Sequence, residues 1–146
     1  ETAKKAKEKG LLNVMVTNGY IGQEPLDQLL PYIDAMNIDL KAYSDRFYRE
    51  LVKGSLAEVK ETIRRSAASC HVEVTTLVIP GWNDSVEEMA EMAGWLASLS
   101  PEIPLHLSRY FPNYEMTDRP PTPLDSLKEL SETARRYLKY VYLGNV

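Results

Sequence analysis

The acid–base pair Asp39 and Lys41 is the sharpest chemical feature of the sequence. The two residues stand two positions apart at the end of a short apolar run. On a β-strand their side chains point to the same side, together with that of Asn37. Burying charge in a sheet is unfavourable unless a partner or a ligand compensates it. The pair is therefore either a salt bridge that closes the rim of a sheet or a clamp for a ligand. In such a clamp Lys41 binds a carboxylate or phosphate, and Asp39 binds a hydroxyl or ammonium group.

Three other segments could contribute to such a site. The Thr-Asn-Gly triplet at 17–19 offers polar side chains near Asp39, although such a triplet is more often only a turn. The segment 80–84, Pro-Gly-Trp-Asn-Asp, is mainly a sharp exit followed by a helix cap, and Trp82 could stack on an aromatic ligand or plug the end of a barrel. The segment 109–112, Arg-Tyr-Phe-Pro, ends a further strand-like run.

The histidines and the cysteine have simpler interpretations. His106 stands between Leu105 and Leu107, which favours a hydrogen-bonded histidine in the core over a catalytic one. Cys70 and His71 adjoin at a helix-to-strand corner without further ligands at metal-binding spacing, so we expect a structural role and no metal site. The sequence contains no glycine-rich phosphate loop, nucleophile elbow or HExxH motif.

Strand-like and helix-like segments alternate along the whole chain. Short apolar, partly β-branched runs predict strands at 11–16, 36–41, 72–79, 104–110 and 140–143. Apolar residues at helical spacing predict helices between them, with capping signals at Ser55 with Glu58, Asp84 with Glu87, and Thr122 before Pro123. The pattern is typical of parallel βαβ units, in which functional groups gather where the strands end. Periodicity alone leaves open a doubly wound sheet or part of a (β/α) barrel. The longest connection, 111–121, is expected to lie over an opening.

Composition restricts the possible partners. The 146 residues are 44% hydrophobic and 26% charged and contain no linker, so we expect a single domain over residues 1–146. A net charge of −4 gives no basic surface for nucleic acid, and no apolar run is long enough to span a membrane. The single cysteine excludes an internal disulfide, which fits a cytoplasmic location. A helix-like start without an initiator methionine, and an end directly after a strand, suggest that both ends are cut from a longer chain.

Three segments, taken together, carry a family resemblance: Thr17-Asn18-Gly19, Asn37-Ile38-Asp39-Leu40-Lys41-Ala42-Tyr43, and Leu77-Val78-Ile79-Pro80-Gly81-Trp82-Asn83-Asp84. In this order they resemble radical S-adenosylmethionine (radical SAM) enzymes related to pyruvate formate-lyase activating enzyme. Segments 105–112 and 140–146 are most similar to the radical enzyme of the AmmeMemoRadiSam system. The resemblance covers nearly the whole chain.

The resemblance implies an α/β fold, a partial (β/α)₆ barrel to which this chain contributes the third strand onward. The cluster-binding CxxxCxxC loop and a Gly-Gly-Glu motif would both lie upstream of Glu1. The resemblance also implies S-adenosylmethionine as cofactor, and six residues that face it. These are Thr17 and Asn18 near the methionyl group, Asp39 and Lys41 as the DxK pair that contacts ribose and carboxylate, and Thr75 and Leu77 on the fifth barrel strand.

In the intact protein, the implied reaction is reduction of S-adenosylmethionine by a 4Fe-4S cluster to a 5′-deoxyadenosyl radical that abstracts hydrogen from a substrate. In activating enzymes that substrate is a glycine of a partner protein. Val16, Thr75 and Phe111 depart from residues common in activating enzymes, which argues against glycyl-radical activation in particular. The chain alone, with one cysteine, is expected to be inactive and to self-associate through its exposed strand at 11–16.

Two other function classes remain open on the residues alone. Lys41 could form a Schiff base in an aldolase-like barrel enzyme, with Asp39 tuning the amine. The acidic α/β scaffold could also be a non-enzymatic module that docks a partner protein.

Overall fold

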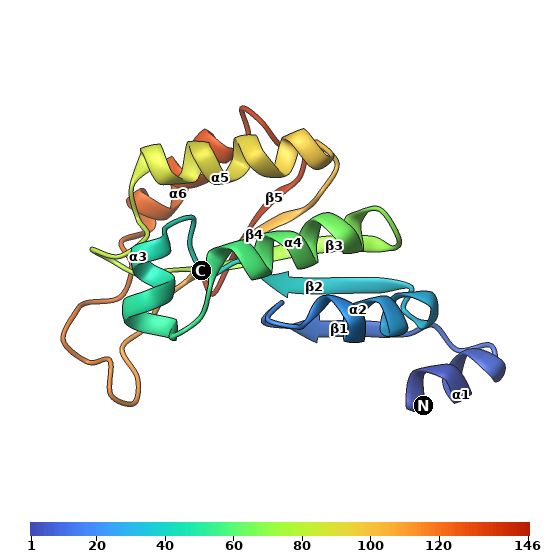
Figure 1. Cartoon of the computed structure of the whole chain (residues 1–146). Helices are drawn as coiled ribbons and strands as arrows, with labels where there is room; N and C mark the ends of the chain where they lie inside the picture. Colours follow the sequence, from blue (N-terminus) through green and yellow to red (C-terminus); the bar gives the residue numbers. More distant parts are fainter.

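Five parallel strands form one sheet in the computed structural model, which describes every residue from 1 to 146 (Figure 1). The strands are β1 (Val14–Thr17), β2 (Ala35–Asp39), β3 (His71–Val78), β4 (Leu105–Arg109) and β5 (Val141–Gly144). Each strand pairs with its neighbours in sequence, so the order is β1-β2-β3-β4-β5 without a reversal. A doubly wound sheet would reverse its order, whereas a sector of a (β/α) barrel does not. The expected α/β partial barrel is confirmed.

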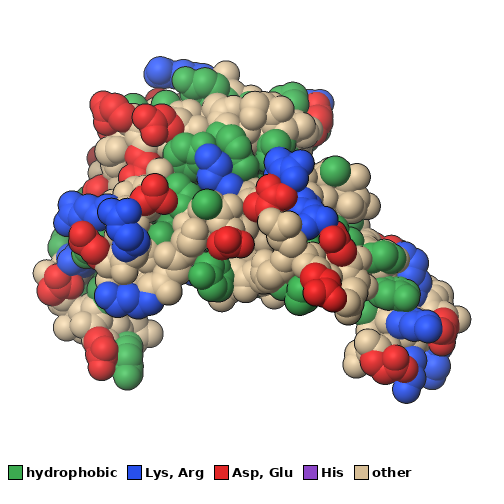
Figure 2. All heavy atoms as spheres, viewed as in Figure 1, with side chains coloured by type: hydrophobic (Ala, Val, Ile, Leu, Met, Phe, Trp, Pro, Cys, Tyr) green, Lys and Arg blue, Asp and Glu red, His purple; other side chains and the backbone are tan.

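Helices connect consecutive strands. They are α2 (Gln23–Leu29) with the 3₁₀ turn η1 (Leu30–Tyr32), α4 (Leu56–Ala67), α5 (Val86–Leu99) and α6 (Leu124–Ala134). The β2–α4 connection holds a short helix α3 (Asp45–Phe47) and a π-helical turn η2 (Tyr48–Val52). A first helix, α1 (Thr2–Glu8), projects beyond the amino end of the sheet (Figure 1) and carries both acidic and basic side chains (Figure 2). None of these helices has the length and apolar character that a membrane span requires.

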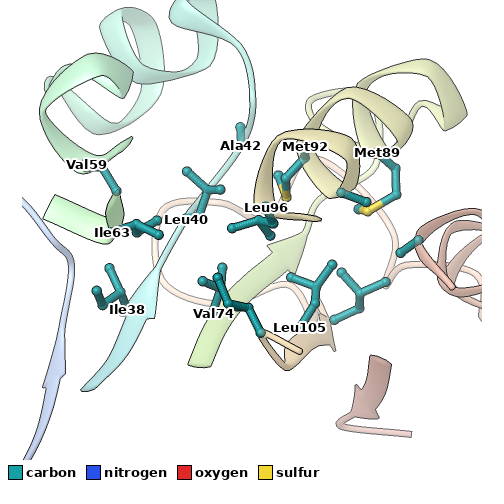
Figure 3. Packing of buried hydrophobic residues seen from close by; sticks show 14 of the residues in the cluster. Ile38, Leu40, Ala42, Val59, Ile63, Val74, Met89, Met92, Leu96 and Leu105 are labelled. Carbon is teal, nitrogen blue, oxygen red and sulfur yellow. The ribbon is translucent and has the colours of Figure 1, made fainter. Parts of the chain in front are cut away.

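The hydrophobic core lies between one face of the sheet and the helices. The register places Ile38 beside Val74 and Val74 beside Leu105, and all three are buried. Figure 3 shows these residues meeting Ile63 of α4 and Leu96 of α5. Because side chains alternate across a strand, burial of every second residue commits the remaining ones to the opposite face.

The opposite face of the sheet, here called the inner face, has no helix over it. It carries the alternate residues Val14, Val16, Asn37, Asp39, Glu73, Thr75, Leu77, His106, Ser108 and Tyr142. All of them are partly or fully exposed, and Val14 and Val16 of the edge strand reach 68% and 77%. In a closed barrel this face lines the interior, so the groups on it are available to a ligand.

Several local predictions were wrong. The first strand begins at Val14 rather than Leu11. The N-cap of α5 is Ser85, whose Oγ accepts a hydrogen bond from the Glu88 N–H, and not Asp84. Ser55 does precede α4, but its side chain makes no capping hydrogen bond. Local sequence signals identified the helices correctly. They misplaced the N-cap of α5 by one residue, and they predicted a capping hydrogen bond at Ser55 that does not form.

Thr122 was predicted to cap α6 and instead joins two strand ends. Pro123 is the residue before α6. The buried hydroxyl of Thr122 donates to the carbonyl of Val78, at 2.6 Å, and accepts from the Tyr110 N–H, at 3.0 Å. The long 111–121 connection therefore returns to the carboxyl ends of β3 and β4 before α6 begins.

Candidate functional site

Asp39 and Lys41 form an ion pair at the carboxyl end of β2. Lys41 Nζ lies 2.7 Å from Asp39 Oδ2, and the two side chains are 38% and 32% exposed. The prediction that they share one side of the chain is confirmed. Asp39 Oδ1 and the remaining ammonium hydrogens of Lys41 have no protein partner. The pair thus presents both an acceptor and a cationic donor to the space beyond the sheet.

The backbone that carries Lys41 is held from four directions. Side chains from outside β2 bind consecutive peptide groups of the segment 40–43: Thr76 Oγ1 donates to Leu40 O (2.7 Å), Tyr48 Oη accepts from Lys41 N (3.1 Å), Asn83 Nδ2 donates to Lys41 O (2.7 Å), and Glu88 Oε1 accepts from Tyr43 N (2.6 Å). A segment fixed in this way cannot shift without breaking several bonds. Its rigidity pre-organises the Lys41 side chain for a ligand.

Asn83 is the central member of these four side chains, which together form a clamp on the backbone of Lys41. Its side chain is 2% exposed and makes three hydrogen bonds. Oδ1 accepts from the Ile79 N–H at 2.7 Å, and Nδ2 donates to the carbonyls of Lys41 and Leu77 at 2.7 and 2.9 Å. The 80–84 segment was expected to be mainly a sharp exit followed by a helix cap, and the role of Asn83 was not predicted. Its side-chain amide, which offers both donors and an acceptor to two strand ends, was the one clue.

Tyr48 closes the site from the side of the π-helical turn. Its ring is buried, and burial raises the pKa of the phenol to about 12, although the hydrogen bond from the Lys41 N–H acts in the opposite direction; the negative charge of Asp39 adds to the rise. Tyr48 therefore remains protonated at neutral pH. The turn ends at Lys53 in a left-handed conformation, with φ +54°. The turn was not predicted because its residues lack an apolar helical period. π-helical turns are rare, and those that occur often lie at functional sites.

Thr75 and Leu77 lie on the inner face beside Asp39. Thr75 is the register partner of Asp39, and its hydroxyl donates to Asn37 Oδ1 at 2.8 Å. Leu77, the next residue of β3 on this face, is partly exposed. Both side chains are thus on the surface from which Asp39 is accessible.

Thr17 is the last residue of β1 and Asn18 follows it, and their side chains have different surroundings. Asn18 lines a cavity of about 110 Å³ together with Lys41 and Tyr48. Thr17 follows the alternation of Met15, so its side chain lies on the helix-covered face, where its hydroxyl accepts from the Gly19 N–H at 3.1 Å. Of the six residues singled out in the sequence, Thr17 is the one whose hydroxyl is directed into a local turn.

The prediction that His106 is a core residue was wrong. His106 lies on the inner face as the register partner of Thr75, and its Nε2 is 2.7 Å from Glu73 Oε2. The flanking leucines are buried on the other face. Sequence alternation identified the two faces correctly, but only one of them is covered.

Cys70 lies at the amino end of β3, away from Lys41. Its thiol is half-buried, and burial, together with the charge of Asp34, raises its pKa. No group of three or more His, Cys, Asp or Glu side chains is arranged to hold a metal ion. The residues of this chain therefore do not fit an iron–sulfur cluster, which takes its ligands from several thiolates.

The sequence is similar to a known family and to several known proteins. Residues 1–93 match the Radical SAM superfamily. The uncharacterized protein MJ0808 of Methanocaldococcus jannaschii is 44% identical over the whole chain, which covers 44% of that protein. The putative glycyl-radical enzyme activating enzyme MJ1632 of the same organism is 27% identical over 97% of the chain, which covers 55% of it. The chain therefore spans about half the length of these curated relatives.

Solved structures share the fold. A domain of pyruvate-formate lyase-activating enzyme from Bacteroides vulgatus superposes with a TM-score of 0.81 at 20% identity, over 99% of this chain and 88% of that one. TYW1 with a lysine-pyruvate adduct bound gives a TM-score of 0.61 at 20% identity, over 93% of this chain and 44% of that one. These two structures thus share the fold of this chain. With a family match that covers well over half of its residues, this chain belongs to the radical SAM superfamily.

Proposed function

We propose that this chain is the part of a radical SAM enzyme that holds S-adenosylmethionine at the carboxyl edge of the sheet. Lys41 binds the methionyl carboxylate, and Asp39 accepts a hydrogen bond from a ribose hydroxyl. Asn18, Thr75 and Leu77 line the same edge. The observation that carries the proposal is the Asp39–Lys41 pair on a clamped backbone, with an acceptor oxygen and donor hydrogens that have no protein partner.

In the intact protein, one-electron reduction of the bound cofactor by an iron–sulfur cluster would release methionine and supply a 5′-deoxyadenosyl radical, which would abstract a hydrogen atom from a substrate. The chain's own residues bind and orient. Lys41 and Asp39 fix the two polar ends of the ligand, while the phenol of Tyr48 and the amide of Asn83 keep Lys41 in place. The hydroxyl of Thr17 contributes through the turn that it forms with the Gly19 N–H beside Asn18, and not by binding the ligand.

Titration of the 146-residue chain with S-adenosylmethionine tests this function directly. Isothermal titration calorimetry should show saturable binding at one site per chain. S-adenosylhomocysteine, which retains the carboxylate and the ribose, should compete for it. Absence of saturable binding by the folded chain would contradict the proposed site.

We predict that the chain alone does not assemble a four-iron cluster. One thiol cannot replace the three that such a cluster requires in this family, and Cys70 lies at the wrong end of β3. Anaerobic incubation with iron and sulfide should leave no stoichiometric cluster absorption. A stable cluster at one per chain, seen also by electron paramagnetic resonance, would contradict the prediction. The isolated chain is accordingly expected to be inactive in cofactor cleavage.

Two sets of observations bear on the hydrogen donor in the intact protein. The names of two relatives, MJ1632 and the isethionate sulfite-lyase activating enzyme of Oleidesulfovibrio alaskensis, support a glycine of a partner protein. Val16, Thr75 and Phe111 depart from residues common in activating enzymes and oppose it. We therefore propose hydrogen abstraction as the general activity, with glycyl-radical activation as one form of it.

The geometry favours this proposal over a Schiff-base enzyme. A Schiff base needs an amine that is free to attack a carbonyl carbon, and Lys41 Nζ is already engaged by Asp39 Oδ2 at 2.7 Å. Borohydride trapping with carbonyl ligands should therefore leave Lys41 unmodified. Membership of an enzyme superfamily likewise favours catalysis over a non-enzymatic docking module.

The outer edge of β1 is expected to make the isolated chain self-associate. β1 pairs only with β2. Val14 and Val16 on this strand are exposed, as are Leu11 and Leu12 just before it. Unpaired strand edges with apolar side chains pair readily with another chain. Light scattering should report a dimer, and Val16→Lys should shift it towards monomer. Val146→Lys, at an equally exposed position outside the edge, is the matched control; a monomeric wild-type chain at high concentration would contradict the prediction.

A further inference from the structure

A second polar cluster lies on the inner face, on the strands β3 to β5 that follow the strand of Asp39. Glu73 stands between two histidines: its Oε1 is 3.2 Å from His71 Nε2, and its Oε2 is 2.7 Å from His106 Nε2. The ring of His106 stacks on that of Tyr142, with centroids 5.3 Å apart and planes 28° apart. Three strands, β3, β4 and β5, thus contribute to one cluster that no role described above uses.

The hydrogen bonds define the protonation state of the cluster. Burial alone would raise the pKa of the Glu73 carboxyl, but the hydrogen bonds from His71 and His106, with the charge attraction to both rings, outweigh it, so the pKa lies below its usual value. An ionised carboxylate can only accept, so each histidine places a hydrogen on Nε2. In the tautomer that carries its hydrogen on Nε2, His106 has its lone pair on Nδ1.

This lone pair is free and accessible. Nδ1 of His106 has no hydrogen-bond partner in the protein, and Ser66 Oγ is the sole fully buried side-chain polar atom without one. Nδ1 must therefore be open to solvent. Stacking on Tyr142 and the bond to Glu73 hold the ring in one orientation, which makes Nδ1 a fixed acceptor.

The sheet register places this acceptor beside the proposed cofactor site. Asp39 pairs with Thr75, and Thr75 pairs with His106, so the three residues form one row on the inner face. Neighbouring strands are about 4.8 Å apart, and His106 therefore lies about 10 Å along the row from Asp39. A substrate that reacts with a cofactor held at Asp39 and Lys41 must lie on this same face.

The charges of the inner face distinguish the two clusters. The carboxylate of Asp39 is balanced by the ammonium of Lys41. Glu73 has two imidazoles as partners and no lysine or arginine. Its carboxylate is the one on this face without a lysine or arginine partner, and a bound group that carries positive charge would complete it.

We propose that Glu73 and His106 form a binding subsite for a protonated amine of the substrate, with His106 Nδ1 accepting an N–H and Glu73 supplying the opposite charge. The inference rests on the proposed cofactor site for its role in the intact enzyme, because that site locates the reacting group on the inner face. The subsite itself is complete within this chain and can be tested without cofactor or activity.

Nitrogen-15 NMR of the histidine-labelled chain provides the test, with ethylammonium as the probe. Long-range correlation spectra should show His106 as the Nε2-protonated tautomer. Ethylammonium should shift the Nδ1 resonance saturably, whereas tetramethylammonium, a cation without an N–H, should not. Glu73→Gln should weaken the ethylammonium affinity about tenfold or more, as loss of a charged acceptor does. His106→Phe, which retains the stack on Tyr142, should weaken it similarly, and Glu102→Gln, at a surface ion pair with Lys139, should not.

Three results would overturn the subsite: an Nδ1-protonated His106, equal shifts with both cations, or unchanged ethylammonium affinity in Glu73→Gln and His106→Phe. Titration of the same wild-type sample with S-adenosylmethionine separates this outcome from a failure of the proposed function. Loss of the amine response with intact cofactor binding rejects only the subsite. An amine response without cofactor binding rejects only the proposed site at Asp39 and Lys41.

Discussion

Lys41→Met should weaken the binding of S-adenosylmethionine by roughly 30- to 150-fold, because the substitution removes a charge-assisted hydrogen bond worth about 2 to 3 kcal/mol. Methionine keeps most of the volume of the lysine stem, so packing against Tyr48 and Asn18 is preserved. The carboxylate of Asp39, 32% exposed, then loses its cation. Part of the decrease in affinity will come from that unpaired carboxylate rather than from the lost ligand contact.

A matched lysine variant and a modified ligand isolate the proposed contact between Lys41 and the methionyl carboxylate. Lys53 lines the same cavity, but its side chain makes no hydrogen bond or ion pair, so Lys53→Met should leave the affinity nearly unchanged. Decarboxylated S-adenosylmethionine lacks the group that Lys41 is proposed to bind, so Lys41→Met should change its affinity much less, and the change that remains measures the effect of the unpaired Asp39 carboxylate. If Asp39 and Lys41 are only a rim salt bridge, Lys41→Met will lower the melting temperature and leave cofactor affinity as it was. That pattern would remove Lys41 from the site.

Much of the fold was predictable because the sequence alternates between two local patterns. All five strands and the four helices between them lie where the apolar periods indicated, within a few residues. The choice between a barrel sector and a doubly wound sheet was not available from these patterns, because strand order depends on contacts between segments far apart. The family resemblance supplied the choice, and the sequential order of the strands confirms it.

The site was predictable only where local geometry decides it. The shared side of Asp39 and Lys41 follows from the two-residue period of a strand. The clamp around Lys41 does not, since Thr76, Asn83 and Glu88 reach the segment 40–43 from 36, 42 and 45 positions away. No local signal reports such contacts.

The error at His106 has a different origin. A parallel sheet is usually buried on both faces, so a polar residue between two leucines was taken as part of the core. Here the helices cover one face, and the alternation places His106 on the other with Glu73 and Tyr142. The same alternation that misled the prediction for His106 explains why Thr75 and Leu77 were placed correctly on the inner face.

Asn83→Ala should reduce the free energy of unfolding by about 3 to 5 kcal/mol, one of the largest effects expected for a single substitution outside the hydrophobic core. Three backbone groups, the buried Ile79 N–H and the part-buried carbonyls of Lys41 and Leu77, would lose this partner. Each orphaned group costs about 1 to 3 kcal/mol, and the three share one small region, so their contributions will not add fully. Urea unfolding measures the change. Asn113→Ala, where the exposed amide only accepts from the Tyr114 N–H, should fall within about 0.5 kcal/mol of wild type.

Asn83→Asp distinguishes loss of the amide donor from loss of packing. The carboxylate retains the acceptor for the Ile79 N–H, but it directs lone pairs at the two carbonyl oxygens that Nδ2 now satisfies. The variant should therefore be at least as unstable as Asn83→Ala at neutral pH, despite its nearly unchanged volume. Protonation of the new carboxyl restores one donor, so its stability should recover partly as the pH falls. Because Asn83 also fixes the carbonyl of Lys41, both variants should lose affinity for S-adenosylmethionine even at temperatures where they remain folded. A variant that unfolds easily yet binds the cofactor as wild type does when folded would show that Lys41 needs no clamp.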